Sequence, residues 1–344
     1  MARPDFAFRT STHTVRAAAG EGLFCAEPGG HQLRLTLEEQ TLPRPLLSPQ
    51  MERAVAAWVI ARGGRQMNLN GERKQIDPRS LDRPAPGAVK RLVSIAPSNT
   101  EIVGSLGAVT LLAGVDNGSD FPPQINSLPR LGPELFVDME ALGRLKPDLV
   151  LASLTVPGME RNITALETLA IPTLVIAPLG LAEIGEGISR VGGALGRERQ
   201  AAEVVAALEL RSRAFRARRS AGAPTRVYLE WWPKPMFSPG GPCWSNELIE
   251  LAGGVNVFAH LAGQSAEVSI EQVARADPEV VFISWCGVPA RKLDPARVKG
   301  RPGLGGVSAV RNARVFAVDE SLLGRPGPRV LDGVARMAEH IQST

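Results

Sequence analysis

The side chains best suited to covalent or metal chemistry are few and scattered in this sequence. The cysteines are Cys25, Cys243 and Cys286 without a C-x-x-C pair, and the four histidines show neither H-E-x-x-H nor i,i+4 spacing. Zinc and thioredoxin-like centres depend on such spacings. The sequence also lacks three common motifs of nucleotide-binding and hydrolytic sites, namely G-x-G-x-x-G after a strand, G-x-x-x-x-G-K-[ST] and G-x-S-x-G. We therefore expect a protein that is not an enzyme and that needs no metal or cofactor.

Two local patterns leave alternatives open. Cys243 and Cys286 are interpreted as buried free thiols, but they would be able to form a disulfide bond if the chain were exported. The glycine-rich run 300–306 (GRPGLGG) is interpreted as a mobile loop beside a ligand cleft. A phosphate-binding loop would directly follow a strand, and no strand is predicted directly before this run.

Composition narrows the class of protein. The chain has 344 residues, 44% of them hydrophobic and 22% charged, which is enough for two domains with apolar cores and excludes global disorder. No apolar stretch approaches the roughly 20 residues of a membrane span. Net charge is +4 without a clustered basic stripe, so we expect no nucleic-acid partner. We expect a monomer.

The elements that would position a site form two α/β series. Residues 1–88 are an N-terminal extension that ends in a proline-rich linker. Residues 89–182 alternate short apolar runs with helical segments, which is typical of βαβ units and a mostly parallel sheet. Helical spacing of apolar residues then predicts one long helix over 183–222, and 223–344 repeat the α/β alternation. The predicted fold is two Rossmann-like lobes bridged by one long helix.

The two lobes share short stretches of sequence. Residues 138–150 match 269–281 at a constant offset of 131, and 101–109 match 247–255 at an offset of 146. The first match places Glu140 and Glu271 early in equivalent helices, where a carboxylate suits the positive helix end. Two interpretations stay open for this pair. They are solvent-exposed capping residues, or they dock onto two arginines of a two-fold symmetric partner.

Four runs of sequence, taken in order, resemble the helical-backbone solute-binding proteins of ABC importers. They are residues 92–102 (LVSIAPSNTEI), 119–123 (SDFPP), 145–150 (LKPDLV) and 325–329 (RPGPR). The most similar members are the periplasmic binding proteins for cobalamin, with those for ferric siderophores and haem nearby. The resemblance covers about residues 90–342. It implies two lobes, a ligand cleft between them, and no catalysis.

The resemblance also implies roles for particular residues. Phe121 would stack on the ligand from the first lobe, and Trp231 or Trp232 from the second. Asp319 and Arg325 would form a charged pair in the final loop of the ligand site. Flat aromatic side chains suit a large planar macrocycle because stacking and apolar burial need no charge match.

Further residues complete the predicted sites. Trp244 and Trp285 also lie in the second lobe and are candidate ligand contacts. By motif position, Glu140 and Glu271 resemble the two glutamates that dock onto arginines of the permease dimer. The expected partners are thus a corrinoid or siderophore ligand and an ABC permease.

The exact ligand and the compartment stay open. Cobalamin binders often carry tryptophans where this chain has Ser153 and the run 264–267 (QSAE). The first 30 residues do not resemble a secretory signal, so we expect a cytoplasmic protein as the sequence stands, or a periplasmic or cell-surface one if the true start lies elsewhere. The alternative function is a cytosolic corrinoid-binding or salvage protein that is not tied to a permease.

Overall fold

The computed structural model divides the chain into two compact units. It describes residues 6–9, 14–18, 22–26, 32–35, 65–67, 73–75, 78–83, 85, 87–218 and 222–342, with only the backbone described before residue 78. Unit 1 comprises residues 1–100 and 109–177, and unit 2 comprises 101–108 and 178–344. Within the described part of the chain, no helix combines the length and apolar character that a membrane span requires.

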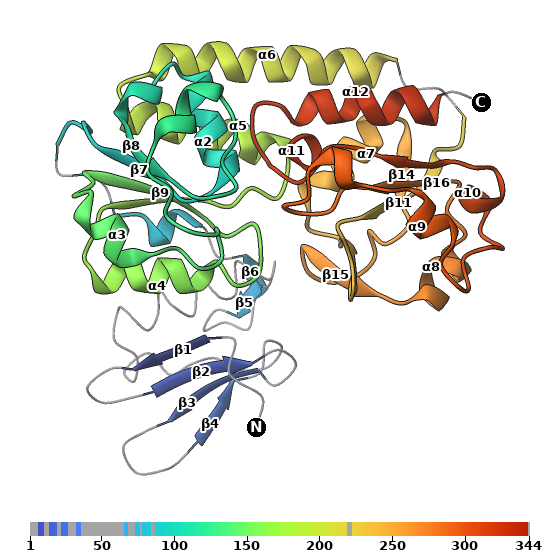
Figure 1. Ribbon diagram of the computed structural model, residues 1–344, viewed down its shortest axis with the longest axis horizontal. Coiled ribbons are helices and arrows are strands. Elements are labelled where there is room, and N and C mark those ends of the chain that lie inside the picture. Colours follow the sequence, from blue (N-terminus) through green and yellow to red (C-terminus); the bar gives the residue numbers. More distant parts are fainter. Residues whose placement is uncertain are drawn as a thin grey trace. The chain divides into compact units, whose positions relative to one another are not determined.

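Unit 1 is built on a parallel four-stranded sheet in the order β10-β9-β7-β8. The strands are β7 (Leu92–Ser94), β8 (Leu112–Val115), β9 (Leu149–Ser153) and β10 (Thr173–Ile176), all apolar runs largely buried inside the unit. The helices of this unit are α3 (Met139–Arg144) and α4 (Glu160–Thr168), whereas α2 (Pro97–Ser105) begins in unit 1 and its residues from 101 onward belong to unit 2. Leu142 of α3 and Ile163 of α4 pack with Val150 in one apolar core, so both helices cover the same face of the sheet (Figure 1).

Unit 2 contains a second parallel sheet in the order β14-β11-β16-β17. Its strands are β11 (Thr225–Glu230), β14 (Gly254–Asn256), β16 (Val280–Ile283) and β17 (Val315–Ala317). A smaller antiparallel sheet joins β12 (Trp232–Pro233), β13 (Met236–Pro239) and β15 (Ser265–Val268). In both units the first parallel strand lies between the second and the third, which confirms the prediction of two α/β lobes with parallel sheets.

Helices cover both faces of the second parallel sheet. Those after the first strand are α7 (Trp244–Leu251), α8 (Ile270–Ala276), α9 (Ala296–Lys299), α10 (Ser308–Arg311), α11 (Glu320–Leu323) and α12 (Val330–Ile341). Val273 of α8 and Val298 of α9 pack in one core with Val281 of β16. In Figure 1, α7 and α12 lie on the side of the sheet opposite α8.

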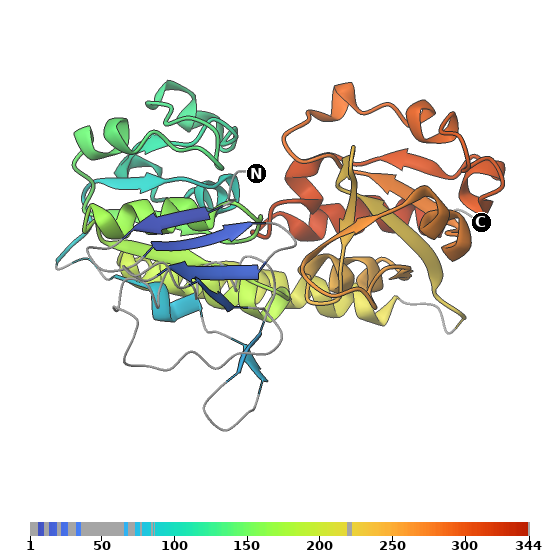
Figure 2. The same cartoon turned by 90° about the horizontal axis from the view of Figure 1, so that it is seen from below.

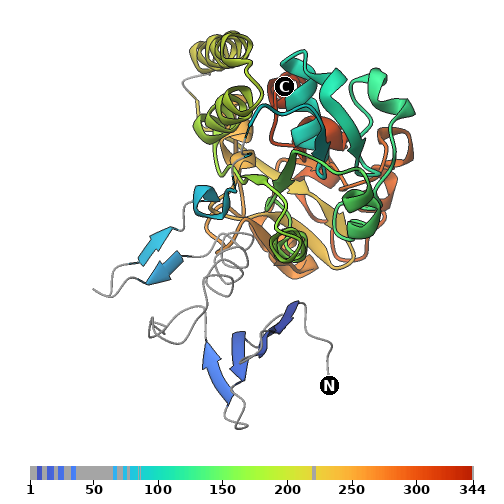
Figure 3. The same ribbon diagram turned by 90° about the vertical axis from the view of Figure 1, so that its left-hand side faces the viewer.

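The prediction of one helix over 183–222 is wrong. The segment forms α5 (Leu181–Ala194) and α6 (Glu198–Ala217), which run side by side and are seen nearly end-on in Figure 3. The break falls at Gly196, whose φ of 62° is left-handed, and at Arg197, whose backbone is not helical. The apolar spacing survives the break, because both helices bury a stripe, so periodicity alone did not reveal the turn.

The N-terminal extension carries strands of its own. β1 (Phe6–Arg9), β2 (Thr14–Ala18), β3 (Gly22–Ala26) and β4 (Gln32–Leu35) form an antiparallel sheet, seen in Figure 2, and β5 (Arg65–Met67) pairs with β6 (Arg73–Gln75). The structure differs from the linker prediction at residues 78–83. Leu81 is buried in the core of unit 1, and Arg83 exchanges two backbone hydrogen bonds with Thr173 of β10.

The matched stretches of sequence fall on equivalent elements. Offset 131 superimposes α3 on α8 and β9 on β16, and the residue in the turn between helix and strand is left-handed in both units (Lys146, φ 48°; Asp277, φ 43°). Asp148 accepts the backbone amide of Arg91, just before β7, and Glu279 accepts that of Arg226, the second residue of β11. The internal repeat predicted from sequence is therefore present in the backbone.

Candidate functional site

Three of the predicted ligand-binding tryptophans follow parallel strands of unit 2. Trp231 and Trp232 come directly after β11, and Trp285 comes two residues after β16. The carboxyl ends of parallel strands meet at one edge of a sheet, so the topology brings these residues to the same edge. The amide of Cys286 donates to the carbonyl of Trp231 at 3.0 Å, which ties the two segments together.

The four tryptophans of unit 2 differ in exposure. Trp231 is 6% exposed and stacks on Trp244 of α7, with ring centroids 5.6 Å apart and an interplanar angle of 27°. Trp244 and Trp285 are buried, and their indole N–H groups donate to Leu323 O and to Glu230 Oε1. Trp232 is 39% exposed, with its N–H directed to Lys234 O at 3.1 Å. Only Trp232 of these four presents a large part of its ring surface.

In unit 1, Phe121 is held on a well-braced loop and is 39% exposed. Asp116 accepts the backbone amides of Gly118 and Ser119, and the Arg130 guanidinium donates to the carbonyls of Asp116 and Ser119. Because these contacts fix the chain just before Phe121, the exposed ring has a defined position. The tryptophan-rich edge of unit 2 therefore has an aromatic counterpart in unit 1.

A second exposed aromatic of unit 1 was missed by the sequence analysis. Phe136 is 64% exposed, and the guanidinium of Arg161 lies 4.3 Å from its ring centroid. The contact is a cation–π interaction between residues 25 positions apart, and no local motif marks it.

The two members of the predicted charged pair, Asp319 and Arg325, make separate contacts. Asp319 caps α11, with Oδ1 accepting the amide of Ser321 at 2.9 Å. Arg325 is buried and forms ion pairs with Glu101 at 3.1 Å and with Glu320 at 3.2 Å. Arg329 also binds the buried carboxylate of Glu101, at 2.7 and 2.9 Å. The arginines of the R-P-G-P-R run thus share Glu101, for which the sequence analysis predicted no role in the site.

The two candidate docking glutamates are both solvent-exposed near the start of equivalent helices. The side chain of Glu140 is 86% exposed and pairs with Arg144 at 2.6 Å. In α8, the side chain of Ser269 and a backbone hydrogen bond lower the pKa of Glu271, so this carboxyl stays ionised at neutral pH. Either residue is available to a cationic surface.

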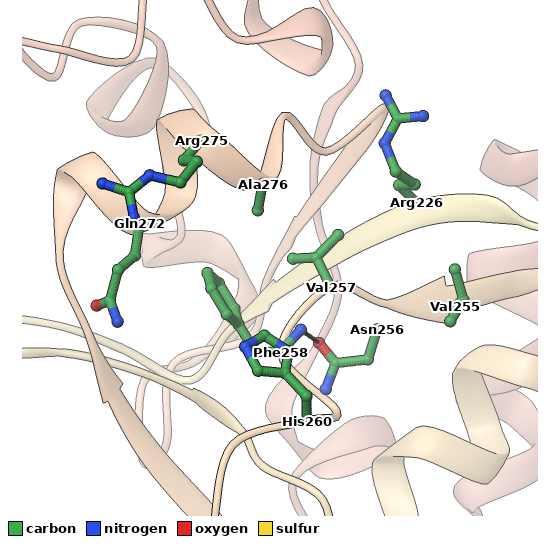
Figure 4. A pocket seen from close by; sticks show the side chains of 9 residues that line it. All are labelled: Arg226, Val255, Asn256, Val257, Phe258, His260, Gln272, Arg275 and Ala276. Atoms are coloured by element: carbon green, nitrogen blue, oxygen red, sulfur yellow. Dashed lines mark hydrogen bonds between the residues drawn. The ribbon is translucent and has the colours of Figure 1, made fainter.

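Unit 2 has a cavity of about 420 Å³ away from the tryptophans, between β14 and α8. Figure 4 shows its lining, in which Gln272 and Arg275 from α8 face Phe258 and His260. Asn256 Oδ1 accepts the amide of Phe258 at 3.0 Å and orders the turn after β14. None of the residues predicted to bind ligand lines this cavity.

The described cysteines have different environments. Cys243 is buried, and burial raises the pKa of its thiol to about 12, whereas Cys286 is half-buried. The two are not joined to each other by a disulfide bond. In the part of the chain that the structure describes, no three His, Cys, Asp or Glu side chains gather in a way that would hold a metal ion.

Two units with parallel sheets of identical strand order, each presenting an exposed aromatic, define a class of two-unit α/β binding proteins. The chain belongs to the periplasmic binding protein family, whose model matches residues 92–322. This match confirms the resemblance noted from sequence.

Known proteins of this class are similar over most of the chain. The vitamin B12-binding protein of Vibrio cholerae is 28% identical over 267 residues, which cover 78% of this chain and 94% of that protein. An uncharacterized ABC transporter substrate-binding lipoprotein, YvrC of Bacillus subtilis, is 29% identical over 260 residues, covering 73% of this chain and 80% of the relative.

Solved structures of periplasmic binding proteins are also similar to this chain in fold. The periplasmic vitamin B12 binding protein BtuF of Vibrio cholerae matches with a TM-score of 0.65 at 28% identity, covering 75% of this chain and 98% of that one. The periplasmic heme-binding protein RhuT from Roseiflexus sp. RS-1 matches with a TM-score of 0.65 at 25% identity, covering 74% of this chain and 98% of its own.

Proposed function

We propose that this chain is the solute-binding component of an ABC importer and that it carries a large planar ligand without changing it. A corrinoid such as cobalamin is the first candidate, and a ferric siderophore or haem is the next. The observation that carries the proposal is the match to a vitamin B12-binding protein over 94% of its length, in sequence and again in fold. Membership of the periplasmic binding protein family supports binding rather than catalysis.

The exposed aromatics supply the chemistry that this ligand class needs. Phe121 and Trp232 each offer a flat apolar face, and stacking on a macrocycle buries that face without requiring a charge match. We assign direct ligand contact to these two residues. Trp231 and Trp244, stacked inside unit 2, would support the surface from beneath, and Trp285 would do the same through Glu230.

Glu140 and Glu271 would serve the second task of an importer component, which is docking onto the permease. Both carboxylates are exposed, and they occupy equivalent positions of an internal repeat. A two-fold symmetric permease would present two equivalent cationic positions to such a pair. Carboxylate–arginine contacts of this kind add orientation as well as affinity.

The first test is a titration of the purified chain with cyanocobalamin, haem and a set of ferric siderophores, followed by tryptophan fluorescence. One of these ligands should quench the fluorescence with a dissociation constant below about 10 µM, equivalent to about −7 kcal/mol. Stacking on an exposed indole is the physical reason for the quench. If every member of the set fails to bind below that concentration, the proposed ligand class is wrong.

A further inference from the structure

A buried hydrogen-bonded cluster around Glu230 and Arg301 lies at the carboxyl end of β11 in unit 2. Glu230 has no exposed surface, and each of its carboxylate oxygens accepts two hydrogen bonds. Oε1 accepts from Trp285 Nε1 at 3.0 Å and from Arg301 Nη2 at 3.0 Å. Oε2 accepts from the Tyr228 hydroxyl at 2.9 Å and from Arg301 Nη1 at 2.6 Å. Arg301 therefore holds Glu230 in a two-pronged contact, the strongest geometry for this pair.

The partners of Glu230 come from separate segments. Tyr228 lies in the same strand, Trp285 follows β16, and Arg301 lies in the glycine-rich run 300–306. Leu304 of the same run is buried in one apolar core with Tyr228 and Trp285. The run that sequence analysis interpreted as a mobile loop is thus attached to the sheet at two points, one ionic and one apolar.

The cluster also lies next to the segments that bear the candidate ligand-binding residues Trp232 and Trp285. Glu230 directly precedes Trp231 and Trp232, and its carbonyl accepts the amide of Ser284 at 2.9 Å. A change in the position of Glu230 would therefore move the segments that bear Trp232 and Trp285. A surface fixed before the ligand arrives loses less conformational entropy on binding.

Burial explains why the pair acts as a unit. A buried carboxylate is costly unless it is paired, and removal of one partner leaves the other charge uncompensated. Replacement of such a pair by apolar residues is often neutral for stability, so an ion pair at this position is better explained by the geometry it imposes. The burial of Tyr228, together with the charge of Glu230, raises the pKa of its hydroxyl, which keeps it a hydrogen-bond donor.

We propose that Glu230 and Arg301 are positioning residues for the ligand-contacting surface of unit 2. Their ion pair fixes the glycine-rich run 300–306 against the ends of β11 and β16 and thereby sets the orientation of Trp232 and Trp285. The expected effect on ligand affinity rests on the proposed function. The expected effect of the ion pair on the order of residues 300–306 does not, because it applies to the protein without ligand.

The test compares Arg301→Met and Arg301→Lys with a matched control, Arg226→Met. Arg226 is a half-exposed arginine at the opposite end of β11 that pairs with Asp277 and Glu279, and its guanidinium is drawn in Figure 4. The first readout is amide hydrogen exchange of the free protein at residues 284–288 and 300–306. The second is the dissociation constant for the best ligand of the titration set, measured well below each variant's melting temperature.

Arg301→Met should speed exchange in both segments at least tenfold and weaken the ligand at least tenfold. Arg301→Lys keeps the charge but cannot form the two-pronged contact, so it should recover part of both losses. Arg226→Met should leave both readouts within twofold of the wild type. If Arg301→Met does not fold, Arg301→Lys against Arg226→Lys carries the same comparison.

Two results would overturn the inference. One is unchanged exchange at 300–306 in Arg301→Met, and the other is an equal effect of the Arg226 control, which would indicate general destabilisation. If the wild type binds no member of the titration set, the proposed function fails, but the exchange measurement still decides the positioning role.

Discussion

At the scale of single residues, Trp231 and Trp232 are neighbours in the chain but have different environments and therefore different expected roles. Neighbouring residues of an extended segment point to opposite sides, so one of the two must turn inward. Trp231 is the buried one, stacked on Trp244, and Trp232 remains 39% exposed. The sequence places both tryptophans after a strand, but it does not show which side faces the core, because that depends on the partner in α7.

Trp232→Ala should weaken the ligand about tenfold or more while leaving the free energy of unfolding nearly unchanged. The ring loses its stacking surface, and a tenfold loss corresponds to about 1.4 kcal/mol. Fluorescence titration and urea unfolding would measure the two quantities. Leu210→Ala is the matched control, because Leu210 is an exposed apolar residue of α6 at 70% exposure. Equal effects of the two substitutions would contradict a stacking role for Trp232.

The residues that sequence reasoning missed share one property, which is distance along the chain. Glu230 and Arg301 are 71 positions apart, and Glu101 meets Arg325 across 224 positions. No local motif marks such pairs, because the groups become neighbours only when the sheet has formed. Phe121 and the tryptophans stay predicted ligand contacts, and they could be proposed from sequence because a family motif and an aromatic side chain are local signals.

At the scale of elements, the hairpin of α5 and α6 depends on glycine. A Cβ atom on Gly192 would lie 2.5 Å from the Cβ of Ala201, and one on Gly185 would lie 3.5 Å from Val205. The helices therefore approach most closely near the turn. The prediction of a single helix failed because apolar periodicity does not show that glycine allows a second helix to pack on the first.

Gly192→Ala should destabilise the protein relative to Gly193→Ala by about 1–3 kcal/mol. Both substitutions improve helix propensity by up to about 1 kcal/mol, but a Cβ on Gly193 meets nothing within 4 Å. Denaturant unfolding of the two variants isolates the cost of crowding against Ala201. If both variants are stabilised equally, the two helices do not pack as closely as described.

At the scale of the whole molecule, the internal repeat was the most informative feature of the sequence. Short apolar runs and one 13-residue match predicted two units with parallel sheets, and the structure gives both sheets the same strand order. The repeat could be predicted because buried strands and helix caps leave local patterns. Two features could not be predicted in this way. They are the antiparallel strands before residue 78 and the pairing of Arg83 with Thr173, because pairing at a sheet edge leaves no strong periodicity in the sequence.

The proposed importer function predicts that Glu140 and Glu271 serve docking and not ligand binding. The measurement that tests this most directly is uptake of the labelled ligand by cells that produce the chain with its own permease. Glu140→Ala combined with Glu271→Ala should reduce uptake at least tenfold while the dissociation constant of the purified protein changes less than twofold. Glu203→Ala with Glu209→Ala, which removes the same charge from exposed positions of α6, should leave uptake unchanged. Undiminished uptake by the Glu140 and Glu271 double variant would contradict the proposed docking role of these two glutamates.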